Sequence, residues 1–321
     1  MPAFHAYEVL PLPFKPHRLD GLTDRLLVSH YENNYGGAVR RLNAIEARFG
    51  GLDPAATPVF DLNGLGRERL IAANSMILHE AYFDALGGSG EPGGGLARAL
   101  ERDFGSVDRW RAEFTAMGKA LAGGSGWVLL TWSERLGRLT NQWAADHAHT
   151  LADGVPVLTL DMYEHAYHLD FGAKAGAYVD AFMRNVHWER IEARYGRALD
   201  PSVPRTPWPN ADVPNVTAAE LRARLDSGED LTLVDVCLPI DFPRRTDMLP
   251  GARFLPPEKI DEWAGDLPRD KPVVAYCIYG FQVSGEATAE LQKRGYDVRS
   301  LVGGITAWHA MSGPTVPLDR G

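Results

Sequence analysis

A carboxylate and an imidazole lie four residues apart in the segment Asp161-Met-Tyr-Glu-His165. An apolar stretch over residues 157–160 precedes the pair, so we expect it where a strand gives way to a helix. One turn of backbone can direct both side chains at one point, as a metal-binding pair requires. The pair by itself is also consistent with an aspartate that caps a helix beside a solvated histidine.

A cysteine near the end of the chain has a second reactive setting. Cys277 follows the apolar run Val273-Val-Ala-Tyr and opens the short loop Ile-Tyr-Gly-Phe-Gln before an expected helix. Loop amides and a helix N-terminus stabilise a thiolate or a persulfide. The alternative is an inert thiol that packs as a small hydrophobic side chain.

Helical periodicity dominates the first part of the chain. Apolar residues recur at three- and four-residue spacing over residues 22–49, 67–86, 106–121 and 170–195. Two short apolar runs, residues 127–132 and 157–161, predict strands between these helices. We therefore expect an α+β domain with its helices first.

Strands and helices alternate in the last third of the chain. Helical patterns at residues 218–225 and 284–294 alternate with short apolar runs at residues 231–236 and 272–277. This order is typical of buried parallel strands that helices cover. The second domain is therefore predicted to be α/β with a central parallel sheet.

A proline-rich stretch separates the two patterns. Five prolines fall between residues 199 and 214, where they disfavour helix and favour extended backbone. The length of 321 residues also exceeds that of one ordinary core. We expect a first domain over residues 1–198, a linker over 199–212 and a second domain over 213–321.

The composition narrows the cellular setting. The formal charge of −9, without clusters of Lys and Arg, disfavours nucleic acid and anionic membranes as partners. No apolar run approaches the length of a membrane helix. Two cysteines exclude a disulfide framework, and the N-terminus does not resemble a secretory signal. A cytoplasmic protein is expected.

The segment Asp161-Met-Tyr-Glu-His-Ala-Tyr167 resembles the Asp-x-Trp-Glu-His-Ala-Tyr signature of the iron/manganese superoxide dismutases. His30 stands at that family's first-ligand spacing from Asn43, and His79 falls in a segment similar to its second-ligand helix. The resemblance covers about residues 1–198 and implies a helical hairpin followed by mixed α/β structure with a small antiparallel sheet. The implied metal ligands are His30, His79, Asp161 and His165.

The resemblance also implies the chemistry. One manganese or iron ion per subunit would alternate between trivalent and divalent states, oxidising one superoxide to oxygen and reducing the next to hydrogen peroxide. Three imidazoles and a carboxylate suit either ion. Gln142 matches the glutamine that hydrogen-bonds the metal-bound solvent in manganese-type enzymes, whereas Ser75 stands where iron-type enzymes carry theirs. Manganese is therefore the predicted metal, with iron as the alternative.

Further residues are carried over from the family. Trp127 and Tyr163 match aromatic positions around the ligands, where their role is to exclude water. Glu164 matches the residue that bonds the partner subunit's His165, which implies a homodimer. An exposed helical glutamate is the competing interpretation of Glu164.

The substrate channel departs from the family pattern. Asn34 and Ala38 stand where the family has a histidine and a gate tyrosine. Neither Tyr31 nor Tyr35 can replace that tyrosine without a different helix register or a kink, which the Gly36-Gly37 pair would permit.

Two further channel positions have changed. His168 stands at the position of the tyrosine that pairs with the channel histidine across the dimer, so we expect a substitute hydrogen bond between Asn34 and His168 of opposite subunits. Ala175 replaces an arginine, and Lys174 is the cation that remains beside it. These changes predict a slower dismutase that still binds metal.

The segments Leu233-Val-Asp-Val, Leu249-Pro-Gly-Ala252 and Leu301-Val-Gly-Gly-Ile-Thr-Ala-Trp308 resemble a single rhodanese domain over about residues 213–318. The implied chemistry is sulfur transfer through a Cys277 persulfide, with sulfur donor and acceptor unknown. Cys237 replaces the arginine that commonly ends the Val-Asp-Val-Arg motif, and a redox-sensitive thiol pair with Cys277 is one hypothesis. An inert Cys237 is the alternative.

Two functions follow from these resemblances. The first is a superoxide dismutase with an appended rhodanese-like module that transfers sulfur or senses oxidants through Cys277. The second is a metal-binding scaffold of low turnover whose activity is sulfur transfer. A third interpretation makes Cys277 part of a recognition loop only.

Overall fold

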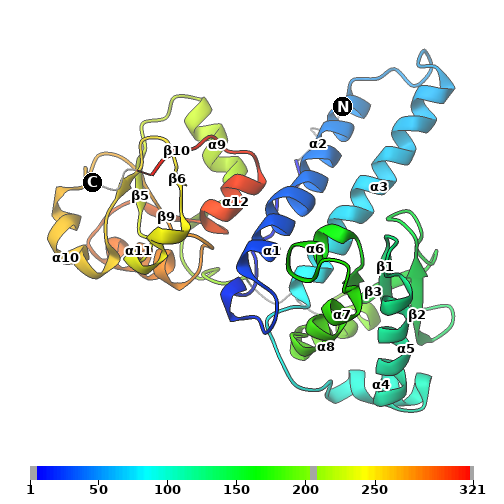
Figure 1. The fold of residues 1–321 in the computed structure, drawn as a ribbon. Coiled ribbons are helices and arrows are strands. Elements are labelled where there is room, and N and C mark those ends of the chain that lie inside the picture. The colour runs from blue at the N-terminus through cyan, green and yellow to red at the C-terminus, as the bar shows by residue number, and fades with distance from the viewer. Residues whose placement is uncertain (1–5, 203–207, 319–321) are drawn as a thin grey trace. The chain divides into compact units, whose positions relative to one another are not determined.

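The computed structural model describes residues 6–202 and 208–318, which divide into two compact units (Figure 1). The first unit comprises Met1–Tyr7 and Pro13–Thr206, and the second comprises Glu8–Leu12 and Pro207–Gly321. Part of the expected linker, residues 203–207, lies outside the described residues. No helix in the two described ranges is long and apolar enough to cross a membrane.

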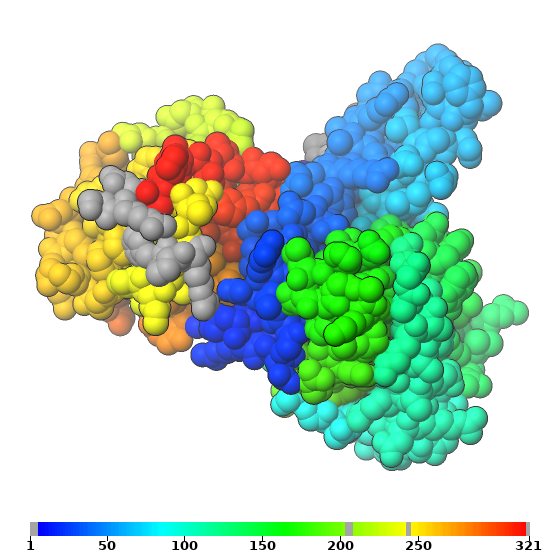
Figure 2. All heavy atoms as spheres, in the orientation of Figure 1, coloured from blue at the N-terminus to red at the C-terminus, as the bar shows by residue number. Residues whose placement is uncertain are grey.

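The first unit opens with helices that a π-helical segment interrupts. The hydroxyl of Thr23 caps α1 (Asp24–Ser29), a π-helix follows over His30–Tyr35, and α2 (Gly36–Gly50) continues in the same direction. α3 (Val59–Asp84) packs along α2 as the second arm of the expected hairpin, which extends from the rest of the unit in Figure 2.

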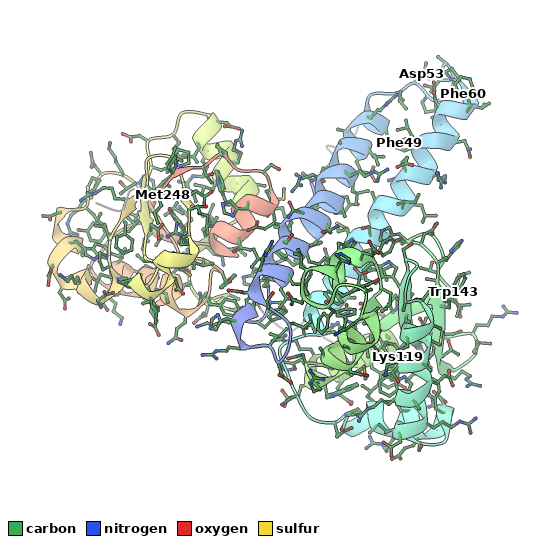
Figure 3. All side chains as sticks on the ribbon, viewed as in Figure 1. Phe49, Asp53, Phe60, Lys119, Trp143 and Met248 are labelled. Atoms are coloured by element: carbon green, nitrogen blue, oxygen red, sulfur yellow. The ribbon has the colours of Figure 1, made fainter. Side chains whose placement is uncertain are left out.

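The tip of this hairpin is apolar and exposed. Val59 and Phe60 open α3, and Phe60 is 72% exposed (Figure 3). These residues break the amphipathic pattern, which explains why α3 was predicted to begin only at residue 67.

Three antiparallel strands form the sheet of the first unit. β1 (Trp127–Ser133) lies between β2 (Arg138–Ala144) and β3 (Gly154–Asp161). The consecutive polar residues Thr140, Asn141 and Gln142 break any alternation in β2, so the sequence does not predict this strand. Asp161, the last residue of β3, pairs with Trp127, the first residue of β1.

Helices cover this sheet, and one predicted helix is wrong. The remaining helices are α4 (Gly94–Phe104), α5 (Val107–Ala120), a 3₁₀-helix (Glu164–Ala166), α6 (His168–Phe171), α7 (Ala175–Arg184) and α8 (Trp188–Leu199). The single helix predicted over 170–195 is broken between α7 and α8. Val186 forms a β-bridge with Leu86 there, and the His187 N–H donates to the Ala85 carbonyl at 2.7 Å. This long-range pairing leaves no trace in local periodicity.

The second unit is built on a parallel sheet, as predicted. In spatial order its strands are β4 (Asn215–Val216), β9 (Val298–Leu301), β8 (Val273–Tyr276), β5 (Thr232–Asp235) and β7 (Arg253–Phe254). A separate antiparallel pair joins β6 (Asp247–Met248), whose Met248 is labelled in Figure 3, to β10 (Val316–Pro317).

Alternate residues of the central strand β8 pack on opposite faces of this sheet. Val273 and Ala275 belong to one core cluster, together with residues of α10 (Ile260–Trp263) and α11 (Gln282–Lys293). Val274 and Tyr276 belong to the other, together with residues of α9 (Ala218–Asp226) and α12 (Gly304–Ala310). Both faces are therefore covered, which confirms the α/β class.

Candidate metal centre

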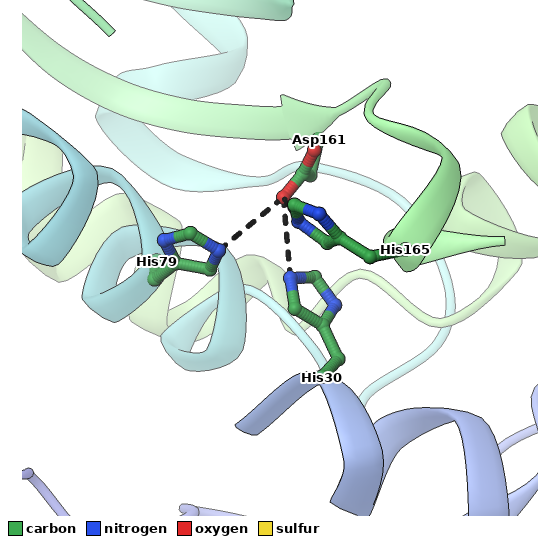
Figure 4. A group of neighbouring side chains, drawn as sticks. All are labelled: His30, His79, Asp161 and His165. Carbon is green, nitrogen blue, oxygen red and sulfur yellow. Dashed lines mark hydrogen bonds and ion pairs between the residues drawn. The ribbon is translucent and has the colours of Figure 1, made fainter. Parts of the chain in front are cut away.

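The four predicted metal ligands come together in the first unit (Figure 4). His30 opens the π-helix, His79 lies near the end of α3, Asp161 ends β3, and His165 lies in the 3₁₀-helix that follows. Their ligand atoms all lie within 4.8 Å of one another. Residues 135 positions apart in the chain thus converge on one point.

Asp161 is the common neighbour of the three imidazoles. Its Oδ2 lies 3.1 Å from Nε2 of His165, 3.2 Å from Nε2 of His30 and 3.6 Å from Nε2 of His79. The side chain of His165 is 25% exposed, whereas those of the other three are almost fully buried. His165 is therefore the most exposed of the four predicted ligands.

Hydrogen bonds prepare His79 for a metal. Its Nδ1 lies 2.7 Å from the Ser75 carbonyl, to which it must donate because a carbonyl oxygen only accepts. The proton of the neutral ring is thereby held on Nδ1, which leaves the Nε2 lone pair directed at the cluster.

Burial sets the charges of the cluster. It lowers the pKa of His30 and lowers that of His79 to about 3, so both rings are neutral at physiological pH. Burial alone would raise the pKa of Asp161, but the imidazoles of His165 and His30 outweigh it and lower that pKa. The cluster thus combines a carboxylate with imidazoles that can donate lone pairs.

Three imidazole nitrogens of the cluster, including Nδ1 of His30, are buried without a good hydrogen bond among the described residues. Nε2 of His30 and Nε2 of His79 lack one among the described residues, although both face Asp161. An unsatisfied buried polar atom is costly. A divalent or trivalent cation between them would accept both lone pairs and compensate the carboxylate, so the residues fit a metal.

The π-helix changes which side chains of the first helix face the cluster. Its longer turn shifts the register after His30, so that the Tyr35 ring stacks on His79 with centroids 6.3 Å apart. The Tyr35 hydroxyl donates to Glu80 Oε1 at 3.1 Å. A different helix register, one of the two conditions for a replacement tyrosine, is therefore present, and it precedes the Gly36-Gly37 pair that would permit a kink.

Aromatic rings enclose the remaining sides. Trp127 is fully buried and meets His79 edge-on, with ring centroids 5.2 Å apart. Tyr163 stacks on His165 at 5.4 Å, and burial raises its pKa to about 12. Both predicted side chains thus lie against ligands of the cluster.

His147 is a site residue that the sequence reasoning missed. Its Nδ1 accepts a hydrogen bond from Trp127 Nε1 at 2.9 Å, and its ring stacks on Tyr163 with centroids 4.9 Å apart. The ring centroid lies 6.2 Å from that of His79. The only signal in the sequence was a histidine five residues after Gln142, in the loop that follows the predicted glutamine.

Comparisons with known proteins bear on this arrangement. A family profile for the C-terminal domain of iron/manganese superoxide dismutases matches residues 92–194, and a profile for a rhodanese-like domain matches residues 217–311. An iron superoxide dismutase of Cupriavidus metallidurans is 68% identical over 193 residues, which is 60% of this chain and 98% of that protein. The chain belongs to the iron/manganese superoxide dismutase family.

More distant members carry either metal in their names. An iron superoxide dismutase of Aquifex pyrophilus is 31% identical and aligns with 58% of this chain and 89% of its own length. A manganese superoxide dismutase of Halobacterium salinarum is also 31% identical, over 60% of this chain and 97% of its own length. Family membership therefore indicates iron or manganese without choosing between them.

The structure does not bring Gln142 to the dismutase site. Gln142 pairs with Leu129 across the sheet, its Oε1 accepts from the Thr131 hydroxyl at 3.4 Å, and its Nε2 donates to the His149 carbonyl at 3.1 Å. The prediction that Gln142 hydrogen-bonds the metal-bound solvent is therefore wrong, because its amide bonds Thr131 and His149 instead. The predicted preference for manganese, which rested on Gln142 and on Ser75, loses its support from Gln142, and the relative that is 68% identical is named an iron enzyme.

The residues predicted to act across a dimer lie at the surface of the dismutase unit. Glu164 and His168 are exposed, and Asn34 is half-buried.

The other altered channel positions differ in exposure. Lys174 is exposed just before α7, whereas Ala175, the first residue of α7, is buried. Ala38 is also buried, at 7% exposure.

The second predicted site lies at the C-terminal end of β8. Cys277 Sγ donates to the Ser284 hydroxyl at 3.4 Å, and the Ser284 hydroxyl donates to the Phe281 carbonyl at 3.3 Å. The start of α12 supports the loop, because the Ile305 N–H donates to the Cys277 carbonyl at 3.0 Å. A Cβ on Gly304 would lie 2.2 Å from that carbonyl, so this close approach requires glycine.

Cys237 follows the neighbouring strand, as predicted. The N–H of Val236 donates to the Tyr276 carbonyl at 2.9 Å, which places the two cysteine-bearing strand ends side by side. Cys237 is completely buried, and burial raises the pKa of its thiol. Both cysteines are free thiols.

A buried cation near Cys237 was missed in the sequence. Arg245 is 6% exposed, and its Nη2 lies 2.7 Å from Asp235 Oδ2. Arg245 thus supplies, from further along the chain, a buried guanidinium that position 237 lacks. The spacing of residues within the local motif could not reveal it.

Proposed function

We propose that the chain dismutates superoxide with one iron or manganese ion held by His30, His79, Asp161 and His165. The observation that carries the proposal is the convergence of four ligand atoms within 4.8 Å around buried imidazole nitrogens. The bound ion supplies reversible one-electron chemistry, by which two superoxide ions and two protons become oxygen and hydrogen peroxide. The zinc alternative would be redox-silent.

The protein's own residues prepare this chemistry. Asp161 supplies the negative charge that offsets the ion, and the Ser75 carbonyl holds His79 in the tautomer that donates from Nε2. Trp127 and Tyr163 exclude bulk water. His147 keeps a proton on Nε2, since its Nδ1 accepts from Trp127.

Metal analysis and a superoxide assay test the proposal together. The purified chain should contain about one iron or manganese per subunit, and His165→Ala should lose both metal and turnover. His17→Ala is the matched control, because His17 is exposed and lies outside the cluster. Turnover of the metal-saturated chain no faster than uncatalysed decay would favour the scaffold alternative.

We also propose a homodimer in which Glu164 bonds the partner subunit's His165. The exposure of Glu164 and the partial exposure of His165 support this arrangement. The hydrogen bond between Asn34 and His168 of opposite subunits is part of the same proposal. Sedimentation of the wild type and of Glu164→Ala tests it, and an unchanged dimer with unchanged metal content would count against the Glu164 contact.

Sulfur transfer through Cys277 is the second proposed activity. The Cys277 thiolate would take the outer sulfur of a persulfide or polysulfide donor, forming an S–S bond while the donor leaves as a thiol or a shorter polysulfide. The loop and the Ser284 hydroxyl at 3.4 Å support the proposal. Loss of persulfide labelling in Cys277→Ser, with retention in Cys237→Ser, is the expected result. We further propose domains over residues 1–198 and 213–321, a linker over residues 199–212, and a cytoplasmic location.

A further inference from the structure

A side chain in the segment predicted as linker holds the Cys277 loop. Asn210 Nδ2 donates to the Gly280 carbonyl at 2.9 Å and also to the Phe281 carbonyl. Both carbonyls belong to the loop between Cys277 and α11. Asn210 itself has a φ of +62°, a left-handed conformation that asparagine adopts more readily than most residues.

The Asn210 amide fits against α11 because residue 285 is glycine. A Cβ on Gly285 would lie 2.3 Å from Oδ1, 2.4 Å from Cγ and 2.7 Å from Nδ2 of Asn210. Packed interiors do not tolerate such overlaps. Any larger residue at position 285 must therefore displace the Asn210 side chain or move the helix.

A chain of hydrogen bonds connects Asn210 to the Cys277 sulfur. The Phe281 carbonyl accepts from Asn210 and, at 3.3 Å, from the Ser284 hydroxyl. The Ser284 hydroxyl accepts in turn from Cys277 Sγ at 3.4 Å. The position of the sulfur's polar neighbour thus depends on the same carbonyl that Asn210 holds.

The two carbonyls also fix the orientation of two amide groups. The C=O and N–H of a trans peptide point in opposite directions, so Asn210 turns the N–H groups of Phe281 and Gln282 to the other side of the loop. Oriented amides at the start of a helix stabilise a sulfur anion.

We propose that Asn210 is a positioning residue for Cys277, which keeps the loop in the conformation that carries sulfane sulfur. The inference rests on the sulfur-carrier role proposed above. It also extends the functional second module to residue 210, inside the predicted linker 199–212.

Alkylation of Cys277 in the full-length chain tests this role. Asn210→Gly keeps the left-handed backbone and removes the amide, and Gly285→Ala displaces the amide without altering it. Each substitution should slow iodoacetamide labelling of the Cys277 peptide at neutral pH by roughly three- to tenfold. Each should also move the midpoint of the curve of labelling rate against pH to a higher pH. Asp212→Ala, an exposed residue in the same segment, is the matched control and should leave both unchanged.

The double variant separates positioning from general damage. If Gly285→Ala acts by displacing Asn210, it should slow labelling no further in the Asn210→Gly background, where the clash is gone. Labelling of Asn210→Gly equal to that of Asp212→Ala would overturn the inference. Polysulfide treatment of the wild type tests the sulfur-carrier role by itself. If no persulfide forms on Cys277, that role is refuted, and Asn210 then does not position a sulfur carrier. The labelling comparison would still decide whether Asn210 positions Cys277.

Discussion

The Trp127 indole donates its N–H to Nδ1 of His147 at 2.9 Å, and this bond fixes the tautomer of an imidazole at the edge of the metal cluster. Burial lowers the pKa of His147, so the ring is neutral and carries its proton on Nε2. Nε2 is therefore the hydrogen-bond donor of this ring.

Removal of the His147 ring should therefore slow dismutation. His147→Ala should lower kcat/KM by roughly ten- to a hundredfold with metal content unchanged, because residues that orient a metal site contribute at this level without being ligands. Pulse radiolysis and metal analysis measure the two quantities. Gln142→Ala is the control and should retain wild-type turnover. A larger loss in Gln142→Ala than in His147→Ala would contradict the assignment.

Metal removal should destabilise the first unit. A metal concentration a thousand times the Kd stabilises the folded state by about 4 kcal/mol, so the chelated protein should unfold at a lower Tm. Calorimetry with and without added metal measures the difference. The Tm of His165→Ala should not rise when metal is added. A wild-type Tm that is the same with and without metal would argue against a site in this cluster.

The register of the first helix predicts the result of restoring a tyrosine at position 38. Ala38 is buried at 7% exposure, so Ala38→Tyr should overpack the core and reduce the free energy of unfolding by roughly 1–3 kcal/mol without raising turnover. Urea unfolding and pulse radiolysis test this, with Ala38→Ser as the small control. Faster dismutation in Ala38→Tyr would mean that residue 38 reaches the channel.

Peroxide should link the two cysteines. Hydrogen peroxide would oxidise the Cys277 thiolate to a sulfenic acid, and the Cys237 thiol would then displace water to form a disulfide. Burial raises the pKa of the Cys237 thiol and keeps it protonated, which disfavours its direct oxidation. Peptide mass spectrometry should find the Cys237–Cys277 linkage in the wild type, and its absence under every peroxide dose would remove the hypothesis.

The ligand set and both fold classes can be predicted from local features of the sequence. Asp161 and His165 are neighbours along the chain, and the segments around His30 and His79 keep their spacing to local landmarks. Periodicity likewise reports local helices and strands, because amphipathic faces repeat within one element. These features needed no knowledge of long-range contacts.

The neighbours that complete the site depend on contacts between distant parts of the chain. Gln142 and His147 are five residues apart, and the pairing of Gln142 with Leu129 keeps it in the sheet, whereas His147 lies in the following loop against Trp127. The π-helix brings Tyr35 to His79, which lies 44 residues further along the chain. Asn210 meets Gly280 across 70 residues. Such contacts depend on the three-dimensional path of the backbone, which short-range patterns do not encode.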